Sequence, residues 1–369
     1  MSTQAEGRIE GLCAWRAILM LGGPLLHATM GREDYPPFMA INIISGSFRM
    51  GSFFMIAGLL SGFAMARRPC PTMWMRTRLV QLGIPTAFGM LVICPMIGLL
   101  TMEGSDERMP ISLYHLWFMV TLIGYTMMAY AVHRVDRRWP VFSYVERRTS
   151  RARVRQTIVL VGTGTLSFLL MIQTLALTSA VTGRYASLTT QLPLAIGYAP
   201  VFLLGLAAAR VPTLRRIVTN GFRMPALILI GAASAHILWR LPWRPAIDPV
   251  LAGSIDDLLL VAAAAFCPPA AAALILRSAN AIRHVPPLLR RLSDASLTMY
   301  ILHYPIIAAL KLMIAPLEWH PWVEWVLAVV VAGGSSYAIH ACLVERSPVA
   351  ALLLNGRPLP RPVQRTAFA

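Results

Sequence analysis

The stretch CAWRAILMLGGPLLH, residues Cys13–His27, holds an arginine and a histidine inside one apolar segment. Arg16 and His27 are eleven positions apart, and that length of α-helix rotates by about 1100°, or three turns plus about 20°. Both side chains are therefore predicted on one face of a helix, with the imidazole about 16 Å further along the axis. Because ionisable groups are costly inside a membrane span, they are candidates for a functional site.

The composition is that of a polytopic membrane protein. The chain of 369 residues is 57% hydrophobic and 13% charged, whereas soluble domains carry about 25% charged residues. We predict an all-α bundle of about ten transmembrane helices, because the apolar segments are close to the ~20 residues that cross a bilayer. Their approximate ranges are 12–30, 48–66, 79–102, 112–132, 156–178, 192–209, 224–240, 257–276, 294–315 and 323–343.

The positions of the basic residues predict how these spans are oriented. With the N-terminus in the cytoplasm, 25 of the 33 lysines and arginines lie in cytoplasmic segments, seven lie on the opposite side, and Arg16 lies within the first span. Positive loops favour the cytoplasmic side, so both termini are predicted to be cytoplasmic. Topology then explains the net charge of +17, with anionic lipid contact as a secondary effect and no nucleic acid as a partner.

We expect a single membrane domain over residues 1–350, followed by a Pro- and Arg-rich cytoplasmic tail over residues 351–369. The longest hydrophilic connection, 133–155, is strongly basic and is predicted to anchor the chain at the membrane surface. The stretch from Gly356 onward is predicted to be extended or disordered. The five cysteines are scattered singly, so no disulfide framework is expected.

Acidic residues are absent from the middle of the predicted spans, since Asp256 and Asp257 open the eighth span and Glu324 opens the tenth. Proton- and cation-coupled transporters usually keep carboxylates near the bilayer midplane, so this pattern favours another class. The titratable groups within the spans are His27, His236, His303 and His340. These histidines lack acidic neighbours, so no metal site is expected. The motifs of common hydrolases, NTPases and zinc proteases are also absent.

His27 is the candidate catalytic residue, together with Arg16, which shares its helix face but is too far away for a direct hydrogen bond. A neutral imidazole can accept a proton near neutral pH and so can act as a general base toward a hydroxyl. The alternative is a structural histidine that is hydrogen-bonded within the bundle. Arg16 can bind an anionic ligand that enters from the cytoplasm, or it can extend to the inner interface.

Three residues are candidates for substrate binding at the outer side. Arg49 is predicted to open the second span, and His115 and Trp117 the fourth, at similar depth. Together they can line an outer mouth for a polar acceptor. Trp117 also fits the interfacial aromatic belt of any membrane protein.

Two further groups of residues are candidates near the cytoplasmic side and the membrane centre. Arg76 and Arg78 lie at the start of the third span, where they can hold phosphates or simply set the topology. In the ninth span Asp294 is a candidate N-cap. Tyr300 and His303 are three residues apart and share a helix face, either in the substrate path or in a packed core.

In the order and spacing of its motifs, the chain resembles the acyltransferase-3 family of integral membrane acyltransferases. Arg16 and His27 match the family's Arg-x10-His pair. Further matches are FFMIAG (53–58), HLWF (115–118), SLTMYILHYP (296–305) and VERSP (344–348), so the resemblance covers nearly the whole chain. SFRM (47–50) and LGIP (82–85) are most similar to the branch that attaches succinyl groups to osmoregulated periplasmic glucans.

The resemblance implies a bundle of about ten helices in the bacterial cytoplasmic membrane. It implies that His27 is the catalytic residue and that Arg16 is the family's arginine on the same helix. It also implies that an Arg-x-x-Arg motif before the third span holds the phosphates of coenzyme A. Three positions depart from the family pattern, namely Cys13 for aspartate, Ala57 for serine, and Gln81 for the second arginine of Arg78-Leu-Val-Gln81. Arg76 is the candidate replacement for that missing arginine.

The predicted function is transfer of an acyl group, with succinyl favoured and acetyl as the alternative, from cytoplasmic acyl-CoA to a hydroxyl of a periplasmic glucan or related polysaccharide. Acyl-CoA is expected as a co-substrate, with no tightly bound cofactor. The alternatives are a transporter or flippase for an anionic or lipid-linked solute, and a sensor that binds acyl-CoA without turnover.

Overall fold

A computed structural model describes residues 10–67, 70–101, 112–152, 154–181, 189–240 and 248–359. These residues form helices and no β-strand, which confirms the predicted all-α class. The helices are α1 (Gly11–His27), α2 (Pro36–Arg67), α3 (Pro71–Phe88), α4 (Cys94–Thr101), α5 (Trp117–Arg138), α6 (Val141–Arg151), α7 (Gln156–Thr178), α9 (Leu192–Gly197), α10 (Ala199–Arg210), α11 (Pro212–Thr219), α12 (Arg223–Arg240), α13 (Pro249–Ala281), α14 (Pro287–Ile314), α15 (Pro321–Ile339) and α16 (Pro348–Asn355).

The described residues contain eight helical segments that are long and apolar enough to cross a membrane. The bent pair α11 and α12, which meet at 63°, makes a ninth if it is one span. With 17 residues, α1 is about 26 Å long and falls just short of that length class. Each of the ten predicted spans overlaps a helix, and the polytopic helical bundle is confirmed. The side of the membrane that each terminus faces stays a prediction.

Several helices begin well before the predicted spans. The second span was placed from residue 48, but α2 starts at Pro36. The predicted N-cap role of Asp294 is wrong, because α14 starts at Pro287 and Asp294 lies inside it. In α13 the side chain that caps the helix is Asp248, which accepts from the backbone of Val250 and Leu251. Both α2 and α14 start at a proline, a residue that is favoured in the first turn of a helix. These helices therefore begin before the apolar stretch that marks each predicted span.

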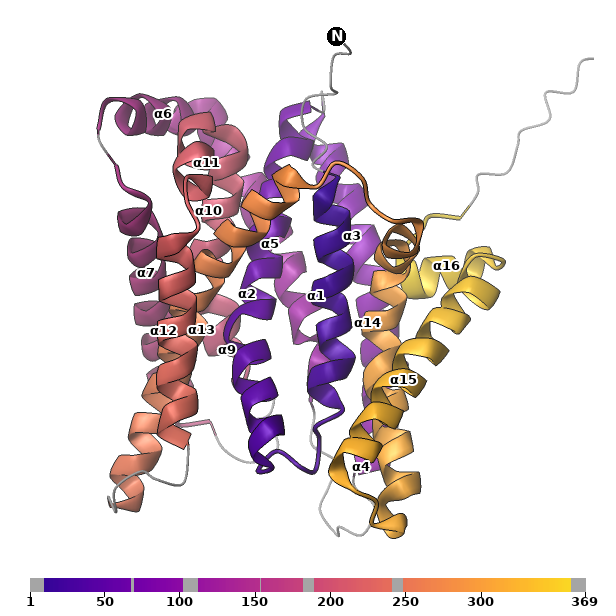
Figure 1. Ribbon diagram of the computed structural model, residues 1–369. Helices are drawn as coiled ribbons and strands as arrows, with labels where there is room; N and C mark the ends of the chain where they lie inside the picture. Colours follow the sequence, from indigo (N-terminus) through magenta and orange to yellow (C-terminus); the bar gives the residue numbers. More distant parts are fainter. Residues whose placement is uncertain are drawn as a thin grey trace, which may run out of the picture.

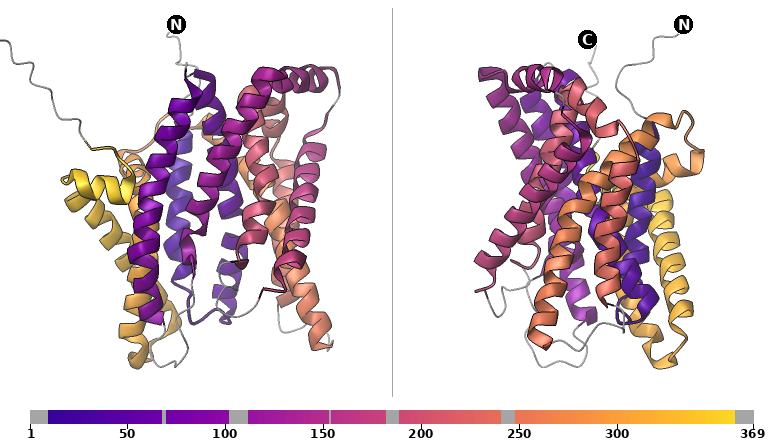
Figure 2. Two further views of the ribbon diagram at one scale, coloured as in Figure 1. Left: turned by 180° about the vertical axis from the view of Figure 1, so that it is seen from behind. Right: turned by 60° about the vertical axis from the view of Figure 1, so that its left-hand side comes forward.

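Successive long helices run up and down through the bundle (Figures 1 and 2). We call the end where α1 begins the N-terminal face; α6, α11 and α16 also lie there (Figure 1). The opposite face holds the α1–α2 connection and the junction of α14 with α15. α1 packs mainly on α14, and α2 packs on α10 and α13.

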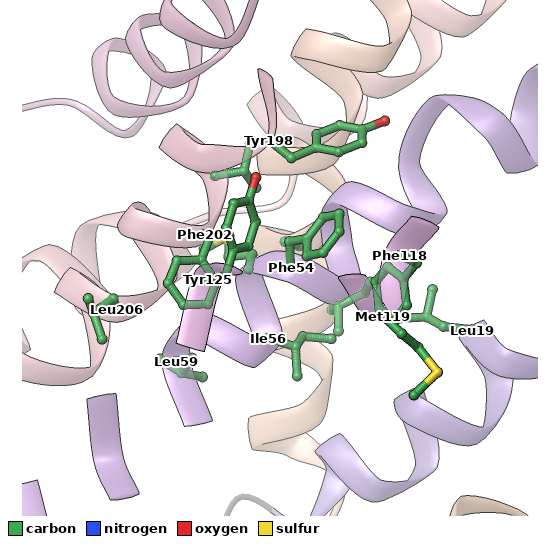
Figure 3. Packing of buried hydrophobic residues seen from close by; sticks show 14 of the residues in the cluster. Leu19, Phe54, Ile56, Leu59, Phe118, Met119, Tyr125, Tyr198, Phe202 and Leu206 are labelled. Atoms are coloured by element: carbon green, nitrogen blue, oxygen red, sulfur yellow. The ribbon is translucent and has the colours of Figure 1, made fainter. Parts of the chain in front are cut away.

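The contact between α2 and α10 is unusually close because glycines face it. A Cβ atom at Gly58 would lie 2.1 Å from the carbonyl oxygen of Phe202, and one at Gly205 would lie 2.0 Å from that of Met55. Small residues allow this approach between membrane helices. Aromatic rings fill the adjoining core, where Phe54 lies 4.9 Å from Tyr125, centroid to centroid (Figure 3). The packed core holds the middle of α2 in a defined position.

Two segments at the N-terminal face bear on the sequence predictions. α6, within the basic 133–155 connection, has no buried residue and lies across the end of the bundle (Figure 1). α16 crosses the boundary predicted between residues 350 and 351, and it packs on α3 and α14. The division into a membrane domain and a tail stays a prediction, and residues 360–369 lie outside the described residues.

Candidate active site

His27 ends α1, three residues after Pro24. Its side chain is half-buried and lies against two rings of α14. The ring centroids of His27 and His303 are 5.3 Å apart, and those of His27 and Tyr304 are 4.8 Å apart in an edge-on contact. Packing between α1 and α14 therefore brings the predicted catalytic residue, His27, into contact with His303, a predicted substrate-binding residue.

His115 brings a third imidazole to the same place. It lies in the 3-10 turn Tyr114–Leu116 that precedes α5, and it stacks on Tyr304 with ring centroids 5.2 Å apart. The ring of His303 is 5.4 Å away, and the hydroxyl of Tyr300 donates to the backbone oxygen of His115. We call His27, His115 and His303 the histidine cluster. Its members come from three different helical segments.

The hydrogen bonds of His115 and His303 leave one nitrogen of each ring free. His115 Nε2 lies 3.2 Å from the oxygen of Ile301, and His303 Nδ1 lies 2.9 Å from the oxygen of Met299. Since a carbonyl only accepts, we assign the proton of each neutral ring to these nitrogens. Among the described residues, His115 Nδ1 and His303 Nε2 are buried without a partner. Two unpaired acceptors therefore lie beside His27.

Arg49 lies next to this cluster and not at a helix start. The expectation that it opens the second span at an outer mouth is wrong, because α2 begins at Pro36 and Arg49 is only 4% exposed. Arg49 packs against the glycine pair of α1: a Cβ atom at Gly22 would lie 2.9 Å from Arg49 Cδ, and one at Gly23 would lie 3.1 Å from both Arg49 Nη1 and His303 Nε2. The absence of side chains at the pair lets Arg49 approach the helix that carries His27.

The charge of Arg49 is unbalanced inside the bundle. No ion pair to Arg49 forms within the part of the chain that the structure describes, and its Nε atom is buried without a hydrogen bond. A buried, unpaired cation is costly. A guanidinium in this position is suited to bind a carboxylate or a developing oxyanion.

A cavity of about 480 Å³ lies nearer the N-terminal face. Arg16 lines it and extends Nη2 to within 3.4 Å of Ser296 Oγ on α14. Arg78 of α3 and Arg357, which follows α16, line it as well. The cavity is therefore basic, and it lies at the end of α1 away from His27.

The cavity extends along α1 toward the histidine cluster. Met20 and Phe118 are among its lining residues, and Met20 is about 10 Å from His27 along the helix axis. The ring of Phe118 lies 5.7 Å from that of Tyr300, which contacts His115. Phe118 thus borders both the cavity and the polar site.

Not all predicted site residues meet. Arg78 lines the cavity, but Arg76 is exposed and is not among the lining residues. Trp117 lies in the hydrophobic core, with its ring 6.2 Å from that of Phe54. Because Arg49 and His115 are both buried, the expected outer mouth of Arg49, His115 and Trp117 does not form at the surface.

Sequence reasoning missed Tyr304, the glycine pair and Arg357. Tyr304 follows Tyr300 by four residues, so helical spacing placed it on the same face. The glycine pair lies between Arg16 and His27, where small residues permit close helix contact. Arg357 carried no such signal, because it was assigned to a tail.

The fold and the site define a polytopic helical membrane protein with a buried histidine–arginine cluster and a basic cavity on one side of it. The model of the acyltransferase-3 family, described as an acyltransferase domain, matches residues 9–341. The chain belongs to this family of membrane acyltransferases.

Its curated relatives include glucans biosynthesis protein C of Escherichia coli O157:H7, which is 24% identical over 412 aligned positions covering 96% of each chain. The protein of the same name from Escherichia coli O81 (strain ED1a) is 23% identical over 393 positions, with the same coverage. The comparison with solved structures gives no match.

Proposed function

We propose that the protein transfers an acyl group, succinyl in preference to acetyl, from cytoplasmic acyl-CoA to a hydroxyl of a periplasmic glucan or related polysaccharide. The single observation that carries this proposal is the arrangement along α1. A basic cavity surrounds Arg16 at one end, and the histidine cluster surrounds His27 at the other. One helix thus joins a site suited to a phosphorylated donor to a site suited to proton transfer.

In the proposed reaction His27 acts as general base. It accepts the proton of the acceptor hydroxyl while that oxygen attacks the thioester carbonyl. The carbon–sulfur bond then breaks, the ester forms, and coenzyme A leaves as the thiol after taking up the proton. The free nitrogens His303 Nε2 and His115 Nδ1 are suited to accept from further hydroxyls of the acceptor and so to orient it.

The choice of donor rests on Arg49. This guanidinium lies beside His303 without a carboxylate partner among the described residues, and a succinyl group would supply one. The glucan acceptor rests on the names of the relatives, which are glucans biosynthesis proteins. A polysaccharide would approach from the face opposite the cavity, where α1 ends at His27.

The test is release of coenzyme A by detergent-purified protein. Acetyl-CoA and succinyl-CoA are offered separately, with and without a β-glucan acceptor, beside a His27→Ala control. We expect acceptor-dependent release with succinyl-CoA, and its loss in the control. Absence of release with either donor from folded protein would reject the proposal and favour the flippase alternative, which moves a solute without breaking a thioester.

A further inference from the structure

The basic lining of the cavity does not come from the third helix alone. Where a second arginine would follow Arg78, the chain has Gln81, and the candidate replacement Arg76 is exposed and outside the cavity lining. α3 therefore contributes one arginine to the cavity. The other two arginines of the lining are Arg16 from α1 and Arg357 from the C-terminal segment.

Local structure at the end of α16 positions Arg357. The helix starts with Ser347, whose hydroxyl accepts from the backbone of Ala350. It ends at Gly356, where the chain turns with φ +61°, a left-handed conformation that favours glycine. The backbone N–H of Arg357 then donates to the oxygen of Ala351 at 3.0 Å. This turn directs the chain back over the cavity.

Contacts with α3 and α14 hold that turn in place. A Cβ atom at Gly356 would lie 2.0 Å from the backbone oxygen of Gln81, so the turn rests on the residue that replaces the missing arginine. Asn355 Nδ2 donates to the backbone oxygen of Asp294 at 3.4 Å. Both Gln81 and Asp294 line the cavity. These contacts hold the backbone of Arg357 at the cavity, which its exposed side chain lines.

Within the part of the chain that the structure describes, no acidic side chain competes for Arg357. It forms no ion pair within the described ranges, and Asp294 is the one acidic residue of the lining beside three arginines. Guanidinium groups bind phosphates through paired N–H donors. A ligand with several phosphate groups would neutralise this excess of positive charge.

We infer that Arg357 takes the place of the missing second arginine and binds the phosphates of the donor, so that the C-terminal segment completes the donor site. This inference rests on the proposed function, in which the donor is acyl-CoA. Arg78 and Arg357 then hold the phosphate end, and the pantetheine arm extends past Arg16 toward His27.

The experiment measures direct binding of coenzyme A and of pantetheine, which lacks phosphates, to the full-length purified protein. Arg357→Ala is compared with Arg346→Ala, which removes the same charge from an exposed position outside the lining. We expect Arg357→Ala to raise the Kd for coenzyme A at least tenfold, with pantetheine binding unchanged. Arg346→Ala should leave both values at those of the unmodified protein.

A restoring variant separates a direct contact from damage to α16. In the Arg357→Ala background, Gln81→Arg should recover part of the affinity for coenzyme A, because it returns a guanidinium to the same side of the cavity. If the unmodified protein binds coenzyme A and Arg357→Ala binds it equally well, the inference is wrong while the proposed function stands. If the unmodified, folded protein does not bind coenzyme A, both are wrong.

Discussion

At the scale of single residues, the site gathers three polar atoms that the fold buries without partners. Arg49 Nε, His115 Nδ1 and His303 Nε2 all lack hydrogen bonds in the described structure. Each such atom costs about 1–3 kcal/mol, and a bound ligand or water that pairs with it removes that cost. A polar substrate bound beside His27 would supply the hydrogen bonds that these three atoms lack.

His27→Ala tests the role of the half-buried imidazole. We expect kcat for acceptor-dependent release of coenzyme A to fall by about 10²–10⁴-fold, the usual contribution of a general base. The Kd for coenzyme A should not change, because His27 does not line the cavity. His284→Ala, at an exposed position, is the control. Transfer at the unmodified rate by folded His27→Ala would contradict the mechanism.

Gly23→Ala tests the close approach of Arg49 and His303 to α1. The added methyl would lie 3.1 Å from Arg49 Nη1 and from His303 Nε2, so both groups must move by a few tenths of an ångström. Small displacements of positioned groups cost large factors in rate, and we expect kcat to fall about tenfold. Gly333→Ala in α15, where a Cβ atom meets nothing within 4 Å, should retain full activity. Equal rates for the two variants would show that this packing is not needed.

At the scale of helices, ion pairs connect neighbouring elements near the opposite face. Glu324 of α15, with a side chain 6% exposed, pairs with Arg32 of the α1–α2 connection at 3.1 Å and with Lys311 of α14 at 3.3 Å. Asp256 of α13 forms an ion pair with Arg240 and a hydrogen bond of 3.2 Å with His236 Nε2, both on α12. These carboxylates therefore join helices, which their positions near predicted span ends did not reveal.

The adjacent pair Asp256 and Asp257 offers a matched comparison of this effect. Asp256→Asn removes the charge that pairs with Arg240 and accepts a hydrogen bond from His236, and we expect a loss of about 1–3 kcal/mol in stability and a lower Tm in detergent. Asp257→Asn alters an exposed carboxylate with no ion pair among the described residues and should leave Tm unchanged. Equal Tm values for both variants would show that the contacts of Asp256 between α12 and α13 do not stabilise the protein.

At the scale of the whole molecule, the proposed function depends on which face meets the cytoplasm. The basic connection that contains α6 lies at the N-terminal face (Figure 1). The cavity, which Arg16 and Arg78 line, lies nearer the same face. The positive-inside rule predicts that this face is cytoplasmic. Acyl-CoA would then reach the cavity directly, and the acceptor would reach His27 from the other side.

Labelling of single cysteines in spheroplasts tests this orientation. Cys70 is exposed and precedes α3 at the N-terminal face, whereas Asp34 is exposed in the α1–α2 connection at the opposite face. In variants that keep one cysteine each, a membrane-impermeant maleimide should label Asp34→Cys in intact spheroplasts and Cys70 only after lysis. The reverse pattern would invert the proposed direction of transfer.

The sequence by itself determined the class of the fold, the approximate position of each membrane-spanning helix, and the placement of Arg16 and His27 on one helix. These properties are local, because apolar length and the helical period act within one segment. Helix starts were less predictable, as the early start of α2 shows, since helices continue past the apolar stretch that marks them.

Only the tertiary structure decided which residues meet. It brought His115 and His303 to His27, moved Arg49 from an expected outer mouth into the bundle, and placed Trp117 in the core. It also brought Arg357 to the cavity in place of Arg76. The physical reason is that contacts between helices depend on which side chains allow close approach, as at Gly22 and Gly23. That property belongs to pairs of distant segments and not to the pattern within either one.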